Sequence, residues 1–198
     1  MRLVLLIFCT LFSFMGIMAQ SKVISLPRLP LLPDDTIPAQ TYYYNTTKTF
    51  NEGGYTYQCD KASYGIVTLY NKANQYTYAH YENKDGSPIG KIENLFPLIE
   101  PDNWTRQKCF SIVNNAFSAE EKLRVKGAKV DVSMTIDTST GKVIEVDFRL
   151  FYNTPTATIP VSTYRNLELI LKNQIWFTLS NNGKKLKFIK RGWMHKIE

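Results

Sequence analysis

The segment from Asp137 to Lys142, with the sequence DTSTGK, carries the residue types that most directly suggest chemistry in this 198-residue chain. An Asp followed by hydroxyl side chains and a Gly is typical of calcium loops, and a Gly-Lys pair is typical of phosphate-binding loops. An EF-type calcium loop starting at Asp137 needs Gly at its sixth position and Glu at its twelfth, where this chain has Lys142 and Phe148. The spacing therefore excludes that kind of calcium loop.

A phosphate loop fails on spacing as well, because it needs Gly five residues before Gly141 and Ser or Thr after Lys142. The chain has Ile136 and Val143 there. Apolar and polar residues alternate on both sides of the segment, which is typical of two strands that are each buried on one face. We therefore interpret the segment as a hairpin turn, in which Asp137 accepts local backbone hydrogen bonds and Gly141 adopts the left-handed conformation.

Other groups that could perform catalysis or bind a metal lack a supporting pattern. His80 and His195 are far apart in the sequence and have no metal-ligating residue at a suitable spacing. Cys59 and Cys109 do not show the spacing of metal ligands either. A nucleophile elbow of the Gly-x-Ser-x-Gly type does not occur in the sequence. The carboxylate pair 145/147 falls on the expected solvent-facing side of a strand. The sequence thus predicts no catalytic residue, no cofactor and no metal site, and we expect a protein that is not an enzyme.

Tyrosines give a second candidate surface. The segment QYTYAHYE reads as a strand with Tyr76, Tyr78 and His80 on one face, and these three residues form our candidate binding surface. Exposed Tyr rings offer a large contact area to a sugar or to a partner chain at little entropic cost. The alternative is that the many Tyr side chains between residues 42 and 81 fill the faces and rim of a small sheet.

The N-terminus predicts export. Residues 1–19 have a basic residue, an apolar run and a small residue at the expected cleavage position, which is typical of a signal peptide. Without these residues the chain is not expected to span a membrane, and we expect a periplasmic or secreted protein. Residues 20–39 contain four prolines and are interpreted as a linker or a strap. In an oxidising compartment Cys59 and Cys109 predict a disulfide that closes a loop of roughly 50 residues, and the alternative is two buried thiols.

The pattern over residues 40–198 predicts a single α+β domain. Residues 40–100 form a Tyr-rich β region, and residues 101–126 contain two helices or one broken helix, with Ser118 and Glu121 as a capping box. Residues 127–198 read as strand, strand, helix and strand. We therefore expect an antiparallel sheet with the helices packed on one face.

Charge does not point to nucleic acid. The formal net charge is +7, but the basic residues are spread along the chain except near its C-terminus. This basic group is either a face for an anionic partner or a guard against pairing at an edge strand; its members are Lys184, Lys185, Lys187, Lys190, Arg191 and Lys196.

The C-terminal residues resemble a known family. The sequence RVKGAKVDVSMTIDTSTGKVIEVDFRL, followed by a helix and a returning strand, resembles the C-terminal domain of TonB-type energy-transducing proteins. Together with the preceding FSAEEKL, it is also similar to small uncharacterised secreted proteins of Bacteroides. The resemblance covers residues 117–198 and implies binding of a partner's extended segment by strand addition. The Tyr-Pro motif of TonB domains is missing, so neither energy transduction nor any functional residue is carried over.

From these observations we expect an exported, non-enzymatic module that binds a macromolecule, either an envelope protein or a polysaccharide. The alternative is a carbohydrate-binding accessory protein that uses a Tyr-rich sheet face. Exposed Tyr rings on one concave face would favour the sugar, and a free edge strand poor in Lys would favour strand addition.

Overall fold

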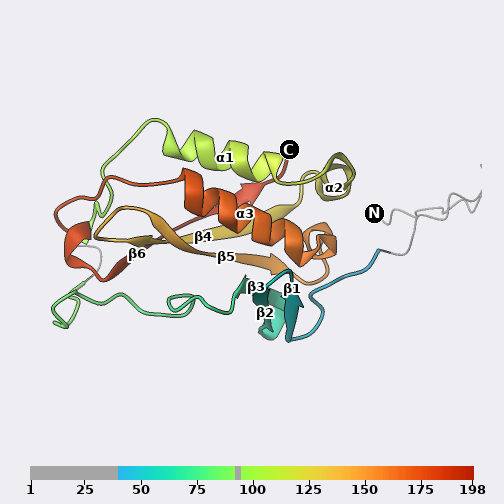
Figure 1. The fold of residues 1–198 in the computed structure, drawn as a ribbon, viewed down its shortest axis with the longest axis horizontal. Helices are drawn as coiled ribbons and strands as arrows, with labels where there is room; N and C mark the ends of the chain where they lie inside the picture. Colours follow the sequence, from blue (N-terminus) through green and yellow to red (C-terminus); the bar gives the residue numbers. More distant parts are fainter. Residues whose placement is uncertain (1–39, 92–94) are drawn as a thin grey trace, which may run out of the picture. The chain divides into compact units, whose positions relative to one another are not determined.

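The computed structural model describes residues 40–91 and 95–198, which contain one continuous antiparallel sheet (Figure 1). The predicted signal peptide and Pro-rich segment lie outside the described residues. The sheet has six strands in the order β1-β2-β3-β5-β4-β6, so β1 and β6 form its two edges. The strands are β1 Lys48–Glu52, β2 Tyr55–Lys61, β3 Ile66–Asn71, β4 Lys129–Asp137, β5 Val143–Phe151 and β6 Phe188–Lys196.

Helices cover one face of this sheet, which confirms the expected α+β class. Figure 1 shows α1 and α3 lying side by side over the strands, with α2 at one end. The helices are α1 Thr105–Asn115, α2 Ala119–Val125 and α3 Val161–Gln174, and short 3-10 turns span Ser63–Gly65, Pro155–Thr158 and Gly183–Lys185. Apolar side chains of β4 and β5 pack beneath the helices and form the core; they include Val130, Val132, Met134, Ile136, Val146, Phe148 and Leu150.

The predicted hairpin joins β4 to β5. Asp137 accepts hydrogen bonds from the backbone nitrogens of Ser139 and Thr140, each at 3.1 Å. Gly141 has a φ of +73°, in the left-handed region that favours glycine. A Cβ atom at this position would lie 2.1 Å from the carbonyl oxygen of Phe177. Gly141 therefore both closes the hairpin and admits the segment that follows α3.

The predicted capping box also forms. The Ser118 hydroxyl accepts a hydrogen bond from the backbone nitrogen of Glu121, and the Glu121 carboxylate accepts one from the backbone nitrogen of Ser118. This arrangement begins α2 directly after α1, so residues 105–125 hold two helices rather than one broken helix.

Part of the second face of the sheet is covered, contrary to our expectation that it faces water. Residues 72–91 run along this face as turns and irregular chain (Figure 1). From here on the strap means residues 72–91 and not the Pro-rich residues 20–39. The Glu145 carboxylate accepts hydrogen bonds from the backbone nitrogens of Gln75 and Tyr76, at 2.6 and 3.0 Å. Glu145 and Asp147 are consequently 7% and 5% exposed. The interpretation of these carboxylates as solvated was wrong, because strand alternation does not show what covers the polar face.

The predicted disulfide is absent from the described residues: Cys59 and Cys109 are both free and buried. Cys59 lies on β2, whereas Cys109 lies on α1 and lines a groove together with Met134 of β4. Strands β3 and β5 separate β2 from β4 in the sheet. At about 4.8 Å per strand this separation exceeds the roughly 7 Å between Cα atoms that a disulfide can bridge. The alternative of two buried thiols is the one that the structure has.

Candidate functional site

A groove beside the edge strand β6 is the candidate functional site. It has a volume of about 440 Å³ and lies between the start of α1, the segment Ile99–Asp102 and the strands β4 and β6. Its apolar lining includes Cys109, Phe110, Met134, Phe177 and Trp193, and its charged lining consists of Glu100, Asp102, Arg106 and Arg191. The groove thus combines an apolar floor with two basic and two acidic side chains, and it adjoins backbone at the sheet edge.

Among the described residues, the side chain of Tyr81 caps the edge of β6 at Lys190. The Tyr81 hydroxyl accepts a hydrogen bond from the Lys190 nitrogen at 3.1 Å and donates one to the Lys190 oxygen at 3.2 Å. The backbone of Lys190 therefore points away from β4. At the other end of the strand, the nitrogen of Ile197 bonds to the oxygen of Ala128, which shows that odd-numbered residues point toward β4.

This alternation leaves part of the edge open. In an antiparallel strand every second residue directs its N–H and C=O to the same side, so Gly192, Met194 and Lys196 point outward like Lys190. Within residues 40–91 and 95–198, no backbone hydrogen bond outside the strand pairing involves Gly192 or Met194. Gly192 is exposed and Met194 is 65% exposed. Because Gly192 has no side chain, a neighbouring backbone can approach it closely.

Two lysines near this part of the edge, Lys187 and Lys190, do not guard it. The Lys190 ammonium donates to the Thr77 carbonyl oxygen at 2.8 Å, and the Lys187 ammonium bonds to the Glu82 carboxylate at 3.0 Å. Both side chains are therefore bound to the strap. Two of the basic residues that the sequence suggested as edge guards thus hold the strap in place instead.

Asp102 fixes the start of α1 and so positions the groove wall. Its carboxylate accepts hydrogen bonds from the backbone nitrogens of Trp104 and Thr105, at 3.0 and 2.7 Å, and one from the Thr105 hydroxyl. Burial acts to raise the pKa of Asp102, but these hydrogen bonds outweigh it and hold the pKa below its usual value. The carboxylate remains charged at neutral pH and is engaged by the helix, so Arg106, Arg191 and the exposed Glu100 are the other charged groups of the groove.

Aromatic rings connect α1 to β6. The Phe110 ring lies 6.3 Å from the Trp193 ring and 5.0 Å from the His195 ring, measured between centroids, and Arg106 lies 5.4 Å from the Phe110 centroid. His195 is buried, with its Nε2 atom 2.8 Å from the Asn114 Oδ1 atom. Burial lowers the pKa of His195, which favours the neutral ring. His195 therefore holds the strand to the helix and is not presented to solvent.

The three residues of the candidate Tyr surface lie apart in the structure. Residues 76–81 form a bend, a turn and irregular chain rather than a strand. The Tyr76 ring packs on Phe188 of β6 at 4.5 Å, whereas the Tyr78 ring packs on Tyr70 of β3 at 5.7 Å. Tyr78 is 60% exposed, its hydroxyl donates to Asp60 at 2.8 Å, and His80 is exposed. Many other Tyr rings are core residues; Tyr44, Tyr57 and Tyr164 are fully buried.

Sequence reasoning missed the groove residues Arg106, Met134 and Trp193. One available signal was Gly192, because an isolated glycine inside a strand pattern marks a site where another backbone can approach. Among the described residues, no group of three His, Cys, Asp or Glu side chains is arranged to hold a metal ion. None of the helices in this part of the chain is long and apolar enough to cross a bilayer.

Comparison with known sequences places this architecture in a family. The family described as "Domain of unknown function (DUF5043)" matches residues 40–193. The chain belongs to the DUF5043 family. A crystal structure of a DUF5043 family protein from Bacteroides uniformis ATCC 8492 is similar to this chain, with a TM-score of 0.72 and 37% sequence identity. The match covers 80% of this chain and 89% of that chain.

No curated protein matches this DUF5043 chain. The expected similarity to an uncharacterised Bacteroides family is therefore confirmed, whereas neither match names a TonB-type protein. The family description states no activity, so any role for the groove beside β6 is inferred from its geometry.

Proposed function

We propose that this DUF5043 protein is an exported, non-enzymatic binding module that takes up an extended peptide segment of a partner protein at the edge of β6. The observation that carries the proposal is the open backbone at Gly192, Met194 and Lys196, next to a groove with an apolar floor. An added strand would pair with these backbone groups, and alternate side chains would enter the groove. Strand addition is also the mode of binding that the resemblance of residues 117–198 to TonB domains implies.

The chemistry of the groove defines the peptide. Tyr81 occupies the edge at Lys190, so an added strand extends from Gly192 toward the C-terminal end of β6. The floor of Cys109, Met134 and Phe177 favours an apolar side chain. Arg106 and Arg191 favour an acidic side chain at the rim, since Asp102 is engaged by α1 and only Glu100 is left to balance the two cations. The segment 1–19, with its signal-peptide pattern, supports export to the periplasm or beyond.

Met194→Pro is the decisive variant. The N–H of Met194 points away from β4, so proline removes an outward donor without removing a hydrogen bond of the sheet. Met194→Ala is the matched control, because it removes the side chain and keeps the donor. The purified chain is immobilised and used to select from a display library of random decapeptides, and the enriched peptides are titrated against both variants.

We expect enriched peptides with alternating apolar residues, whose affinity falls at least tenfold in Met194→Pro and by a smaller factor in Met194→Ala, which loses a side chain at the groove but keeps the N–H. Thermal unfolding of both variants verifies that the sheet is intact. Equal affinity for a folded Met194→Pro variant, or the enrichment of no peptide, would show that the edge is not a binding site.

A further inference from the structure

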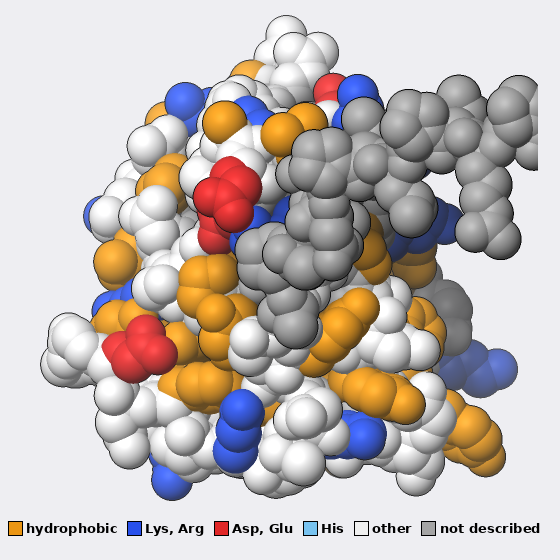
Figure 2. All heavy atoms as spheres, turned by 90° about the vertical axis from the view of Figure 1, so that its right-hand side faces the viewer, with side chains coloured by type: hydrophobic (Ala, Val, Ile, Leu, Met, Phe, Trp, Pro, Cys, Tyr) orange, Lys and Arg blue, Asp and Glu red, His pale blue; other side chains and the backbone are white. Residues whose placement is uncertain are grey.

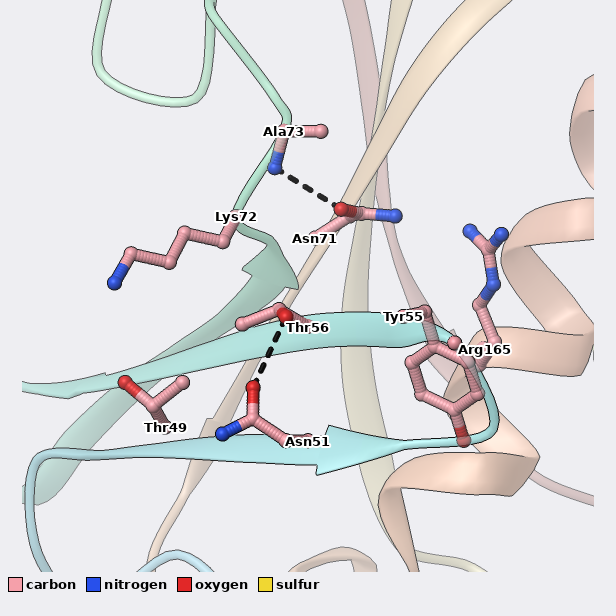
Figure 3. Close-up of a pocket in the computed structure, with 9 residues that line it drawn as sticks. Thr49, Asn51, Tyr55, Thr56, Asn71, Lys72, Ala73 and Arg165 are labelled. Atoms are coloured by element: carbon pink, nitrogen blue, oxygen red, sulfur yellow. Dashed lines mark hydrogen bonds between the residues drawn. The ribbon is translucent and has the colours of Figure 1, made fainter.

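A second, polar pocket lies at the other end of the sheet, where β3 ends and the strap begins (Figure 3). It has a volume of about 660 Å³ and is widely open to solvent. Strands β1 and β2, the end of β3, the start of the strap and α3 all contribute to it. The lining residues are Thr49, Asn51, Gly54, Tyr55, Thr56, Asn71, Lys72, Ala73 and Arg165.

Two asparagines are held with their amide nitrogens free. The Asn71 Oδ1 atom accepts a hydrogen bond from the backbone nitrogen of Ala73 at 3.0 Å, and a backbone nitrogen can only donate, which fixes the orientation of this amide. The Asn51 Oδ1 atom accepts one from the Thr56 hydroxyl at 3.0 Å. Figure 3 shows both bonds. Among the described residues neither amide nitrogen has a partner, so each has two N–H groups available to a ligand.

Cationic side chains flank these amides. Figure 3 shows Lys72 on one side of the pocket and Arg165 on the other. Arg165 bonds to the Glu168 carboxylate at 2.8 Å, but Lys172 approaches the same carboxylate at 3.5 Å. One carboxylate therefore balances two cations, and a net positive charge remains on this group beside the pocket. None of the described residues that line the pocket is acidic.

Hydroxyl oxygens complete the pocket. Thr49 donates its hydroxyl hydrogen to Gln58 at 2.7 Å, and Thr56 donates its own to Asn51. Both oxygens keep lone pairs that can accept a hydrogen bond from a ligand hydroxyl. The pocket thus presents donors and positive charge for an anion, together with acceptors for neighbouring hydroxyl groups.

We propose that this pocket binds an acidic sugar, with the ligand carboxylate held by the Asn71 amide and by Arg165, which face each other in Figure 3, and with the Asn51 amide bonded to a ring oxygen on the other side of the pocket. A carboxylate accepts several hydrogen bonds, and charge-assisted bonds are stronger than neutral ones. The ring hydroxyls of the sugar donate to Thr49 and Thr56. This site uses none of the residues of the groove beside β6, so it stands independently of the proposed peptide binding.

Asn71→Asp tests the pocket with a minimal change. The Asp side chain keeps the acceptor that Ala73 uses, but it replaces the free NH₂ group with a charged oxygen that repels a carboxylate. Asn181→Asp is the matched control, since Asn181 is exposed and is not a lining residue. The isotope-labelled chain is titrated by NMR with glucuronate, with glucose, which lacks the carboxylate, and with sulfate, which lacks the ring hydroxyls.

We expect glucuronate at millimolar concentrations to shift the signals of Asn51, Asn71 and their neighbours, and we expect the affinity to fall at least tenfold in Asn71→Asp. The Asn181→Asp control should keep the affinity of the unaltered chain, and glucose and sulfate should bind more weakly. If sulfate binds as tightly as glucuronate, the pocket recognises an anion and not a sugar, which would overturn the proposal. Absent binding of all three ligands, or equal binding by Asn71→Asp, would also overturn it.

Discussion

Asp147 shows how the covered polar face changes the chemistry of one carboxyl group. The strap and the neighbouring strands bury the side chain, and this burial raises its pKa to about 6, even though Lys190, Arg149 and Ser133 act in the opposite direction. Asp131, on the adjacent strand, adds to the increase. The folded protein therefore binds this proton more tightly than the unfolded chain does, in which the pKa is near 3.8.

Asp147→Asn is expected to stabilise the protein at high pH. The favourable contribution of the proton is complete below about pH 4 and is lost as the pH rises through about 6. Asn resembles the protonated carboxyl group, so we expect a gain of roughly 1–3 kcal/mol in the free energy of unfolding at pH 8 and little change at pH 4. Urea unfolding at both pH values measures this difference.

Asp85→Asn serves as the control for Asp147→Asn, because Asp85 is exposed in the strap and its oxygen that accepts from Ser87 is kept. It should give no gain at pH 8. An equal gain at pH 4 and pH 8 for Asp147→Asn would mean that burial does not raise the pKa of the Asp147 carboxyl group.

At the scale of elements, local patterns predicted the hairpin and the capping box, whereas the strap was not predictable. The hairpin depends on residues within one turn of Asp137, and these bonds form in any context that pairs β4 with β5. In the strap, Tyr76 and Tyr78 alternate as they would in a strand, yet their rings pack on Phe188 and Tyr70. Contacts with residues far away in the sequence determine whether this segment forms a strand or an irregular chain, and a local pattern does not contain those residues.

Gly141→Ala tests how far the hairpin depends on the segment after α3. Gly86→Ala is the matched comparison, because Gly86 has a φ of +77° but no atom within 4 Å of an added Cβ. In both variants the left-handed backbone lowers the free energy of unfolding by about 1–2 kcal/mol. Only Gly141→Ala also forces Phe177 to move, so we expect a loss of about 3 kcal/mol or more in unfolding free energy. Equal losses for the two variants would show that Phe177 moves without cost.

The whole molecule presents several exposed apolar side chains, but exposure alone does not mark a site. Figure 2 shows hydrophobic side chains in separate groups between charged and polar ones, on the end of the molecule where α2 and β1–β3 lie. What singles out β6 is the combination of open backbone, a glycine and an adjoining groove. The sequence could not show this combination, because Gly192 becomes an edge residue only when β6 takes the last place in the sheet.

No covalent bond joins Cys59 to Cys109, so packing and hydrogen bonds hold the sheet and its helices together. Burial raises the pKa of the two thiols to about 11 and about 12, so both are protonated and shielded in the folded protein. We therefore expect dithiothreitol to leave the unfolding midpoint unchanged. Iodoacetamide should modify the peptides that contain Cys59 and Cys109 only after denaturation, as measured by peptide mass mapping. A midpoint that falls on reduction, or a mass of the unreduced peptides that shows them joined, would mean that the protein closes this bond by moving β2 and α1 together.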